Sequence, residues 1–102
     1  MKEVIVKGKE NGEILVVLSG EIDSSNADAF YAEVLSAYEK EPCSVRFDCE
    51  RLAFIDSTTL GTFVKILKKV KEGGNNLVLE KLQPKIKKLF LICALDTIME
   101  IH

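Results

Sequence analysis

The chain has 102 residues, of which 47% are hydrophobic and 29% charged, and its formal net charge is −2. This length predicts a single domain over residues 1–102, with a core large enough to need no metal or disulfide. The composition excludes intrinsic disorder, and the lack of a basic excess argues against nucleic-acid binding. We find no apolar run of membrane-spanning length and no signal peptide, so we expect a cytoplasmic protein without membrane association.

Charge is unevenly distributed along the chain. Residues 1–60 carry 6 basic and 12 acidic side chains, whereas residues 61–102 carry 8 and 4. We therefore expect an acidic and a basic region on the folded molecule, for which two solvated faces are the ordinary explanation.

The cysteines do not indicate chemistry. Cys43, Cys49 and Cys93 follow no metal or redox spacing, so we predict buried, reduced thiols. The one histidine is His102, and no metal site is expected.

Two strands are predicted at the start of the chain. Residues 4–6 are typical of an edge strand, and Asn11-Gly12 is a strong hairpin signal. Residues 14–18 are apolar without alternation, which favours a strand covered on both faces, and Gly20 is expected to end it.

A helix and a third strand follow. Apolar residues recur at helical spacing over residues 27–40, and the segment Ser24–Asn26 offers a cap, with Ser25 and Asp28 as a capping box. Residues 45–49 alternate as a strand.

The second half continues the alternation of helix and strand. Helical spacing from Leu60 to Val70 ends at Gly73-Gly74, and residues 77–79 predict a short buried strand. Pro84 begins a third helix, and residues 98–101 form a last strand or helical turn.

This order predicts an α/β fold. Right-handed crossovers between parallel strands, together with the first hairpin, give a mixed sheet of about four or five strands with helices packed mainly on one side. The predicted core comprises Leu15, Val17, Val45, Phe47, Phe63, Leu67 and Leu79.

Motifs for catalysis are absent from the sequence. There is no nucleophile elbow, no phosphate-binding glycine loop and no internal histidine to serve a serine nucleophile. We therefore expect neither catalytic residues nor a cofactor.

Two polar segments remain. Asp56-Ser57-Thr58-Thr59 lies where a helix begins, and free N–H groups there favour a phosphate. Gly20-Glu21-Ile22-Asp23 follows a strand. Taken separately, an ordinary helix cap and an ordinary turn explain them.

Together, these segments resemble the STAS family, and specifically its bacterial anti-sigma factor antagonists. The resemblance is carried by Leu18–Asp23, Phe54–Gly61 and Gly73–Leu77, and more weakly by Gln83–Phe90, in family order and at family spacing over the full length.

The resemblance implies a function. Such proteins bind an anti-sigma factor that is also an ATP-dependent serine kinase, and binding releases the sigma factor. The kinase phosphorylates the serine that matches Ser57, and a phosphatase reverses the modification. The implied partner-binding residues are Glu21, Asp23, Asp56, Ser57, Thr58 and Thr59.

One residue departs from the family pattern. Where Thr59 stands the family usually has Gly, and we expect the β-branched side chain to crowd the approach to Ser57. Thr58 and Thr59 are alternative phosphate acceptors. The alternative function is a constitutive, unphosphorylated STAS subunit of a lipid or anion transport assembly.

Overall fold

A tight hairpin starts the fold, as Asn11-Gly12 predicts. Both residues have positive φ, 54° and 81°, which a turn between two twisted strands requires. The turn joins β1 (Val4–Glu10) to β2 (Glu13–Ile22) in an antiparallel pair. The computed structural model describes residues 3–102.

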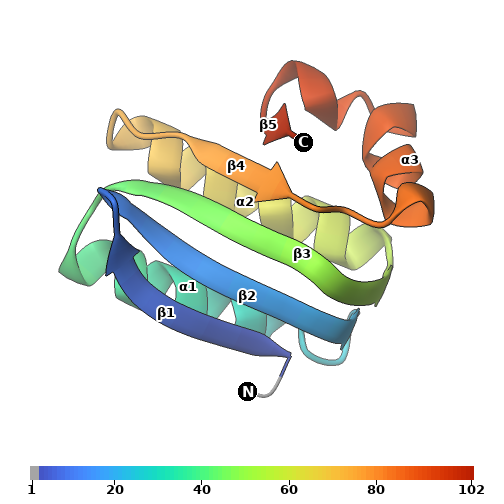
Figure 1. The fold of residues 1–102 in the computed structure, drawn as a ribbon, viewed down its shortest axis with the longest axis horizontal. Coiled ribbons are helices and arrows are strands. Elements are labelled where there is room, and N and C mark those ends of the chain that lie inside the picture. Colours follow the sequence, from blue (N-terminus) through green and yellow to red (C-terminus); the bar gives the residue numbers. More distant parts are fainter. Residues whose placement is uncertain (1–2) are drawn as a thin grey trace.

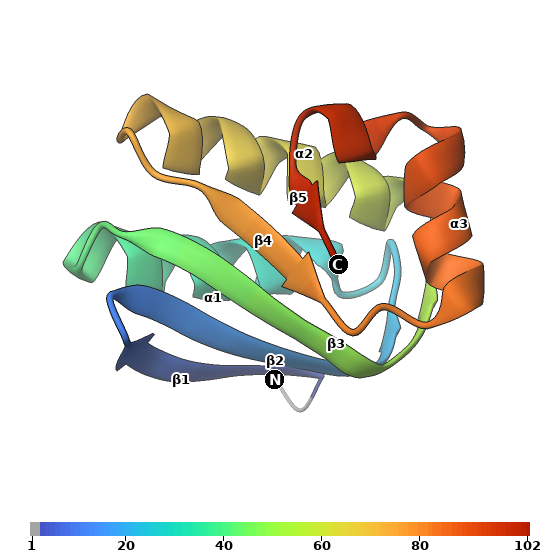
Figure 2. The ribbon, with the colours of Figure 1, turned by 45° about the horizontal axis from the view of Figure 1, so that its top comes forward.

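In the described residues, five strands form one mixed sheet in the order β1-β2-β3-β4-β5, and every pair after the first is parallel. The helix α1 (Ala27–Lys40) leads to β3 (Ser44–Ile55), α2 (Ser57–Glu72) leads to β4 (Leu77–Glu80), and α3 (Pro84–Ile92) with the turn η1 (Leu95–Thr97) leads to β5 (Glu100–Ile101). Each crossover moves one strand in the same direction, so right-handed connections put the helices on one face (Figures 1 and 2).

Four phenylalanines hold the helices to the sheet. Phe63 on α2 packs edge-on against Phe30 of α1, Phe47 of β3 and Phe90 of α3, with ring centroids 5.2, 5.4 and 5.5 Å away. All four rings have no exposed surface. Phe90 therefore brings α3 beside the first half of α2, where it closes one end of the core (Figure 2).

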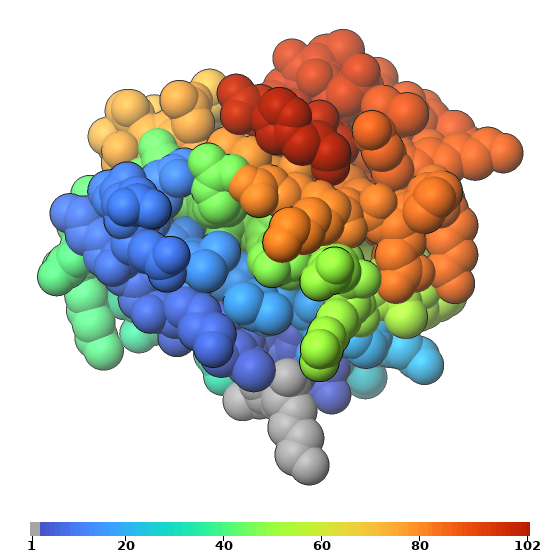
Figure 3. Space-filling model, viewed as in Figure 1, coloured from blue at the N-terminus to red at the C-terminus, as the bar shows by residue number. Residues whose placement is uncertain are grey.

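In residues 3–102 no helix covers the opposite face of the sheet, which corrects the expectation that β2 is covered on both faces (Figures 1 and 3). Ile14, Val16 and Leu18 are buried under the helices, whereas Leu15 and Val17 are half-buried on the open face. The prediction of Leu15 and Val17 as core was wrong because five consecutive apolar residues give no period from which to choose the buried set. The other five predicted core residues are buried.

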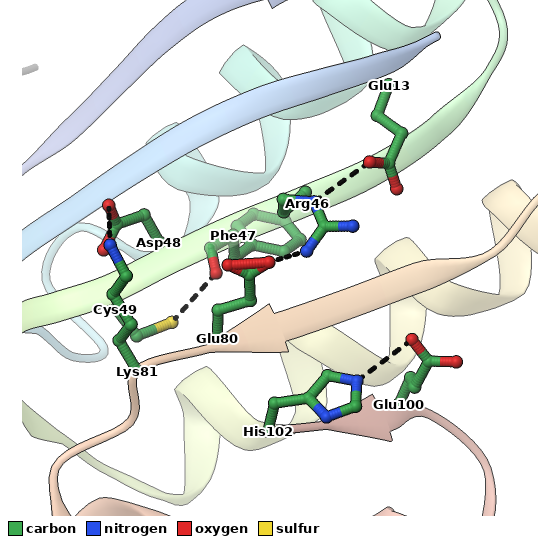
Figure 4. Close-up of polar contacts among 9 residues, drawn as sticks. All are labelled: Glu13, Arg46, Phe47, Asp48, Cys49, Glu80, Lys81, Glu100 and His102. Carbon is green, nitrogen blue, oxygen red and sulfur yellow. Dashed lines mark hydrogen bonds and ion pairs between the residues drawn. The ribbon is translucent and has the colours of Figure 1, made fainter. Parts of the chain in front are cut away.

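Ion pairs cross the open face between strands. Arg46 on β3 lies between Glu13 of β2, 3.0 Å away, and Glu80 of β4, while Lys81 lies 3.8 Å from Asp48 (Figure 4). On the open face of the sheet, these charged side chains therefore alternate with the half-buried apolar residues.

The cysteines are free thiols, as predicted, but Cys93 is exposed where burial was expected. Cys43 and Cys49 are buried, and desolvation, with a smaller effect of the neighbouring Asp48 charge, raises the pKa of Cys49 to about 12. Among residues 3–102, none of the helices has the length and apolar character needed to span a bilayer.

Candidate functional site

The two polar segments meet because β2 and β3 end side by side. Ile22 and Ile55, the last residues of these strands, are partners in the parallel register. The prediction that Gly20 ends β2 is wrong: Gly20 adopts φ 69° at an irregularity in the pairing, and the strand continues to Ile22. Glycine accommodates this conformation because it has no Cβ.

Asp56 connects the two segments. One carboxylate oxygen, Oδ1, accepts the Thr59 N–H at 3.0 Å and so caps α2, and the other, Oδ2, accepts the Ser24 N–H at 3.0 Å. The Thr59 amide is the largest cause of a lowered pKa at Asp56, so the carboxyl is ionised at neutral pH. The negative charge also lies at the positive end of the helix dipole.

Thr59 makes a second connection between the same segments. Its hydroxyl donates to the carbonyl oxygen of Ile22 at 2.6 Å and lies 3.0 Å from Asp56 Oδ1. The hydroxyl has one proton, so the shorter contact, to Ile22, is the principal hydrogen bond. The side chain has no exposed surface.

The segment between β2 and α1 is folded on itself. Asp23 Oδ1 accepts from the Ser25 N–H at 2.9 Å and the Ser25 hydroxyl at 2.5 Å, and Asn26 Oδ1 accepts the Asp23 N–H at 2.8 Å. Asn26 also donates to the Glu21 carbonyl at 3.0 Å. The predicted Ser25–Asp28 capping box does not form, because Asn26 is the N-cap residue of α1.

Ser57 is the first residue of α2, and its side chain is exposed beside the exposed Thr58. This exposure makes the Ser57 hydroxyl accessible. Backbone N–H groups and the dipole at a helix start stabilise a phosphate. The local chemistry thus suits a modified serine.

The structure brings together the predicted site residues but not all of them on the surface. Glu21, Ser57 and Thr58 are exposed, and Asp23 and Asp56 are half-buried. Thr59 is a correction: a side chain exposed beside Ser57 was expected, whereas Thr59 is buried and its hydroxyl donates to the Ile22 carbonyl. Its burial leaves Ser57 and Thr58 as the exposed hydroxyl residues of this segment.

The sequence did not indicate the structural roles of Ser24 and Asn26. The sequence predicts only a helix cap from Ser24–Asn26, whereas in the structure the Ser24 amide donates to Asp56 and Asn26 hydrogen-bonds within the loop. The Asp23-Ser24-Ser25 sequence, a pattern typical of side chain–backbone turns, was the available signal. No group of three or more metal-ligating side chains suited to a metal ion occurs in the described part of the chain.

Comparison with known proteins shows the family of the chain. Residues 4–102 match the STAS domain family model. The chain is 37% identical over 98 residues to the anti-sigma-B factor antagonist of Bacillus subtilis, covering 96% of this chain and 88% of that protein.

Two solved structures share the fold. A crystal structure from Thermotoga maritima, described as a candidate anti-sigma factor antagonist, has a TM-score of 0.88 at 23% identity and covers 96% of this chain and 84% of its own. The phosphorylated form of the Bacillus cell fate determinant SpoIIAA has a TM-score of 0.76 at 19% identity and covers 97% and 90%. The chain therefore belongs to the STAS domain family, among its anti-sigma factor antagonists.

Proposed function

We propose that this protein binds an anti-sigma factor with serine kinase activity while Ser57 is unphosphorylated, and that phosphorylation of Ser57 ends binding. Binding releases a sigma factor for transcription, and a phosphatase restores the active form. The protein acts in the cytoplasm. The surface that binds the partner comprises Glu21, Asp23, Asp56, Ser57 and Thr58. Anti-sigma factor antagonists are regulatory proteins rather than enzymes, and ATP belongs to the kinase.

The observation that carries the proposal is the exposed Ser57 at the first position of a capped 16-residue helix.

In the transfer, a bond forms between Ser57 Oγ and the γ-phosphorus of ATP while the bond between that phosphorus and the β–γ bridging oxygen breaks. ADP leaves, and the hydroxyl proton passes to the kinase. The hydroxyl is accessible to both the kinase and the phosphatase.

The expected effect on binding follows from charge. Phosphorylation adds about −1.5 to −2 charge at neutral pH, next to the ionised Asp56. A partner surface shaped for a neutral hydroxyl would have to accommodate a dianion beside existing carboxylates. A loss of about 3 kcal/mol would weaken affinity more than a hundredfold.

The decisive experiment uses the anti-sigma factor kinase of the same organism with ATP. We expect one phosphate per chain, mapped to Ser57 by mass spectrometry, and none on Ser57→Ala, which should still bind the partner. Ser57→Asp should bind the partner more weakly than wild type does but more tightly than the phosphoprotein does, because aspartate carries one charge on a shorter side chain.

Thermal melting of each variant controls for folding, because either side chain is tolerated at a helix start. Phosphate found on Thr58 would move the acceptor by one residue. The proposal is wrong if the kinase adds no phosphate and Ser57→Asp binds as tightly as wild type, and a constitutive STAS subunit would then explain the fold.

A further inference from the structure

The loop that follows β2 is held against α2 by hydrogen bonds to two side chains. The Asp56 carboxylate holds the Ser24 amide at 3.0 Å, and the Thr59 hydroxyl holds the Ile22 carbonyl at 2.6 Å. The two contacts fall on either side of Asp23. Both contacts come from the first turn of α2 and its cap, the turn that also presents Ser57.

The contact of Thr59 is the less exposed of the two. Thr59 has no exposed surface, whereas the Ser24–Asp56 contact is open to solvent. Water competes for the exposed contact and leaves the buried one as the stronger constraint. Without the hydroxyl, the Ile22 carbonyl would lose its side-chain donor at the point where the chain leaves the sheet.

We propose that Thr59 is a positioning residue for the phosphorylation of Ser57, because its buried hydroxyl orders residues 22–26 and so presents the acidic loop and the acceptor serine as one surface. This inference rests on the proposed function. Thr59 does not take part in the transfer. It acts through the loop, so its removal should weaken recognition by the kinase and leave the chemical step intact.

The test compares Thr59→Val, which removes the hydroxyl at nearly constant shape, with Thr59→Ser, which keeps it. Thr62→Val is the matched control: Thr62 is also a buried threonine of α2, but its hydroxyl donates within the helix, to the Thr58 carbonyl at 3.0 Å. If Thr59→Val does not fold, the comparison of Thr59→Ala with Thr59→Ser replaces it.

Two measurements are made on each variant. By NMR, exchange of the Ser24 amide with water should be about tenfold faster in Thr59→Val, an opening difference of about 1.4 kcal/mol, and unchanged in Thr59→Ser and Thr62→Val. In phosphorylation by the kinase named above, Thr59→Val should raise KM about three- to tenfold with kcat within about twofold.

The outcomes separate the two proposals. Equal Ser24 exchange and equal KM in Thr59→Val and Thr62→Val overturn the positioning role even if Ser57 is phosphorylated normally. A fall in kcat with unchanged KM also overturns it, since the loop would then not act in recognition. If wild type receives no phosphate, the proposed function fails, and Ser24 exchange alone decides whether Thr59 orders the loop.

Discussion

A single carboxylate at the start of α2 has to serve both the helix and the neighbouring loop. The hydrogen bonds that Asp56 accepts from Thr59 and Ser24 are strongest when its carboxyl group is ionised. These bonds therefore lower the pKa of Asp56 below the ordinary value of 3.8. A carboxyl with a lower pKa in the folded state stabilises the fold above the unfolded-state pKa. That stabilisation is lost as the pH falls through the folded-state pKa.

Asp56→Asn should therefore lower stability at neutral pH by an amount that shrinks on acidification. Asparagine can still cap the helix, but it carries no charge and cannot titrate. Urea unfolding at pH 6, 4 and 3 should show the gap between wild type and variant narrowing below about pH 4, the region of the unfolded-state pKa. Asp28→Asn, an exposed carboxylate of α1, controls for the loss of a negative charge; a gap of constant size across this range would contradict the assignment.

At the scale of elements, α2 has a buried apolar face and one residue, Gly61, of low helix propensity. Phe63, Ile66 and Val70 are buried at helical spacing, but Gly61 lies exposed in the second turn. An added Cβ at Gly61 would meet no atom within 4 Å, and its φ is not positive. The glycine thus costs helix stability without serving the backbone.

Gly61→Ala is expected to stabilise the protein by about 0.5–1 kcal/mol, measured as a higher urea midpoint at unchanged slope. Gly74→Ala is the contrasting variant. Gly74 has φ 78° after the end of α2, so an alanine there should destabilise. A destabilised Gly61→Ala would mean that Gly61 has a role in the fold that its surroundings do not reveal.

Elements with an unambiguous period were predictable from sequence. The helix over residues 27–40 matches α1, and Pro84 begins α3. The buried phase of β2 was not predictable, because apolar side chains occupy both of its faces. Within the site, the Asp56-Ser57 motif indicated the helix start, but the orientation of Thr59 depends on the Ile22 carbonyl, 37 residues earlier in the chain.

The whole molecule depends on a small number of aromatic contacts between layers. Phe63 touches a ring from α1, from β3 and from α3, so it joins every α-helix to the sheet. Removal of the Phe63 ring should therefore weaken the packing of the whole core and not of one helix alone.

Phe63→Ala should cost about 3–5 kcal/mol in the free energy of unfolding, the usual range for a buried phenylalanine. Phe54→Ala provides the comparison, because Phe54 is 46% exposed at the end of β3 and its removal should cost far less. Urea titration followed by circular dichroism measures both. Similar losses in the two variants would show that the aromatic cluster is not the centre of the core.

The strand order has a consequence for how the chain folds. Each strand pairs with the one made immediately before it, from β1 to β5, so the sheet needs no partner that has yet to be synthesised. Short separations between paired segments keep the contact order low for a parallel sheet and favour fast folding. On the ribosome, the hairpin can form first, and every helix–strand unit can then add to a finished edge. Growth in this direction leaves the C-terminal segment, with its two-residue β5, as the last part to join.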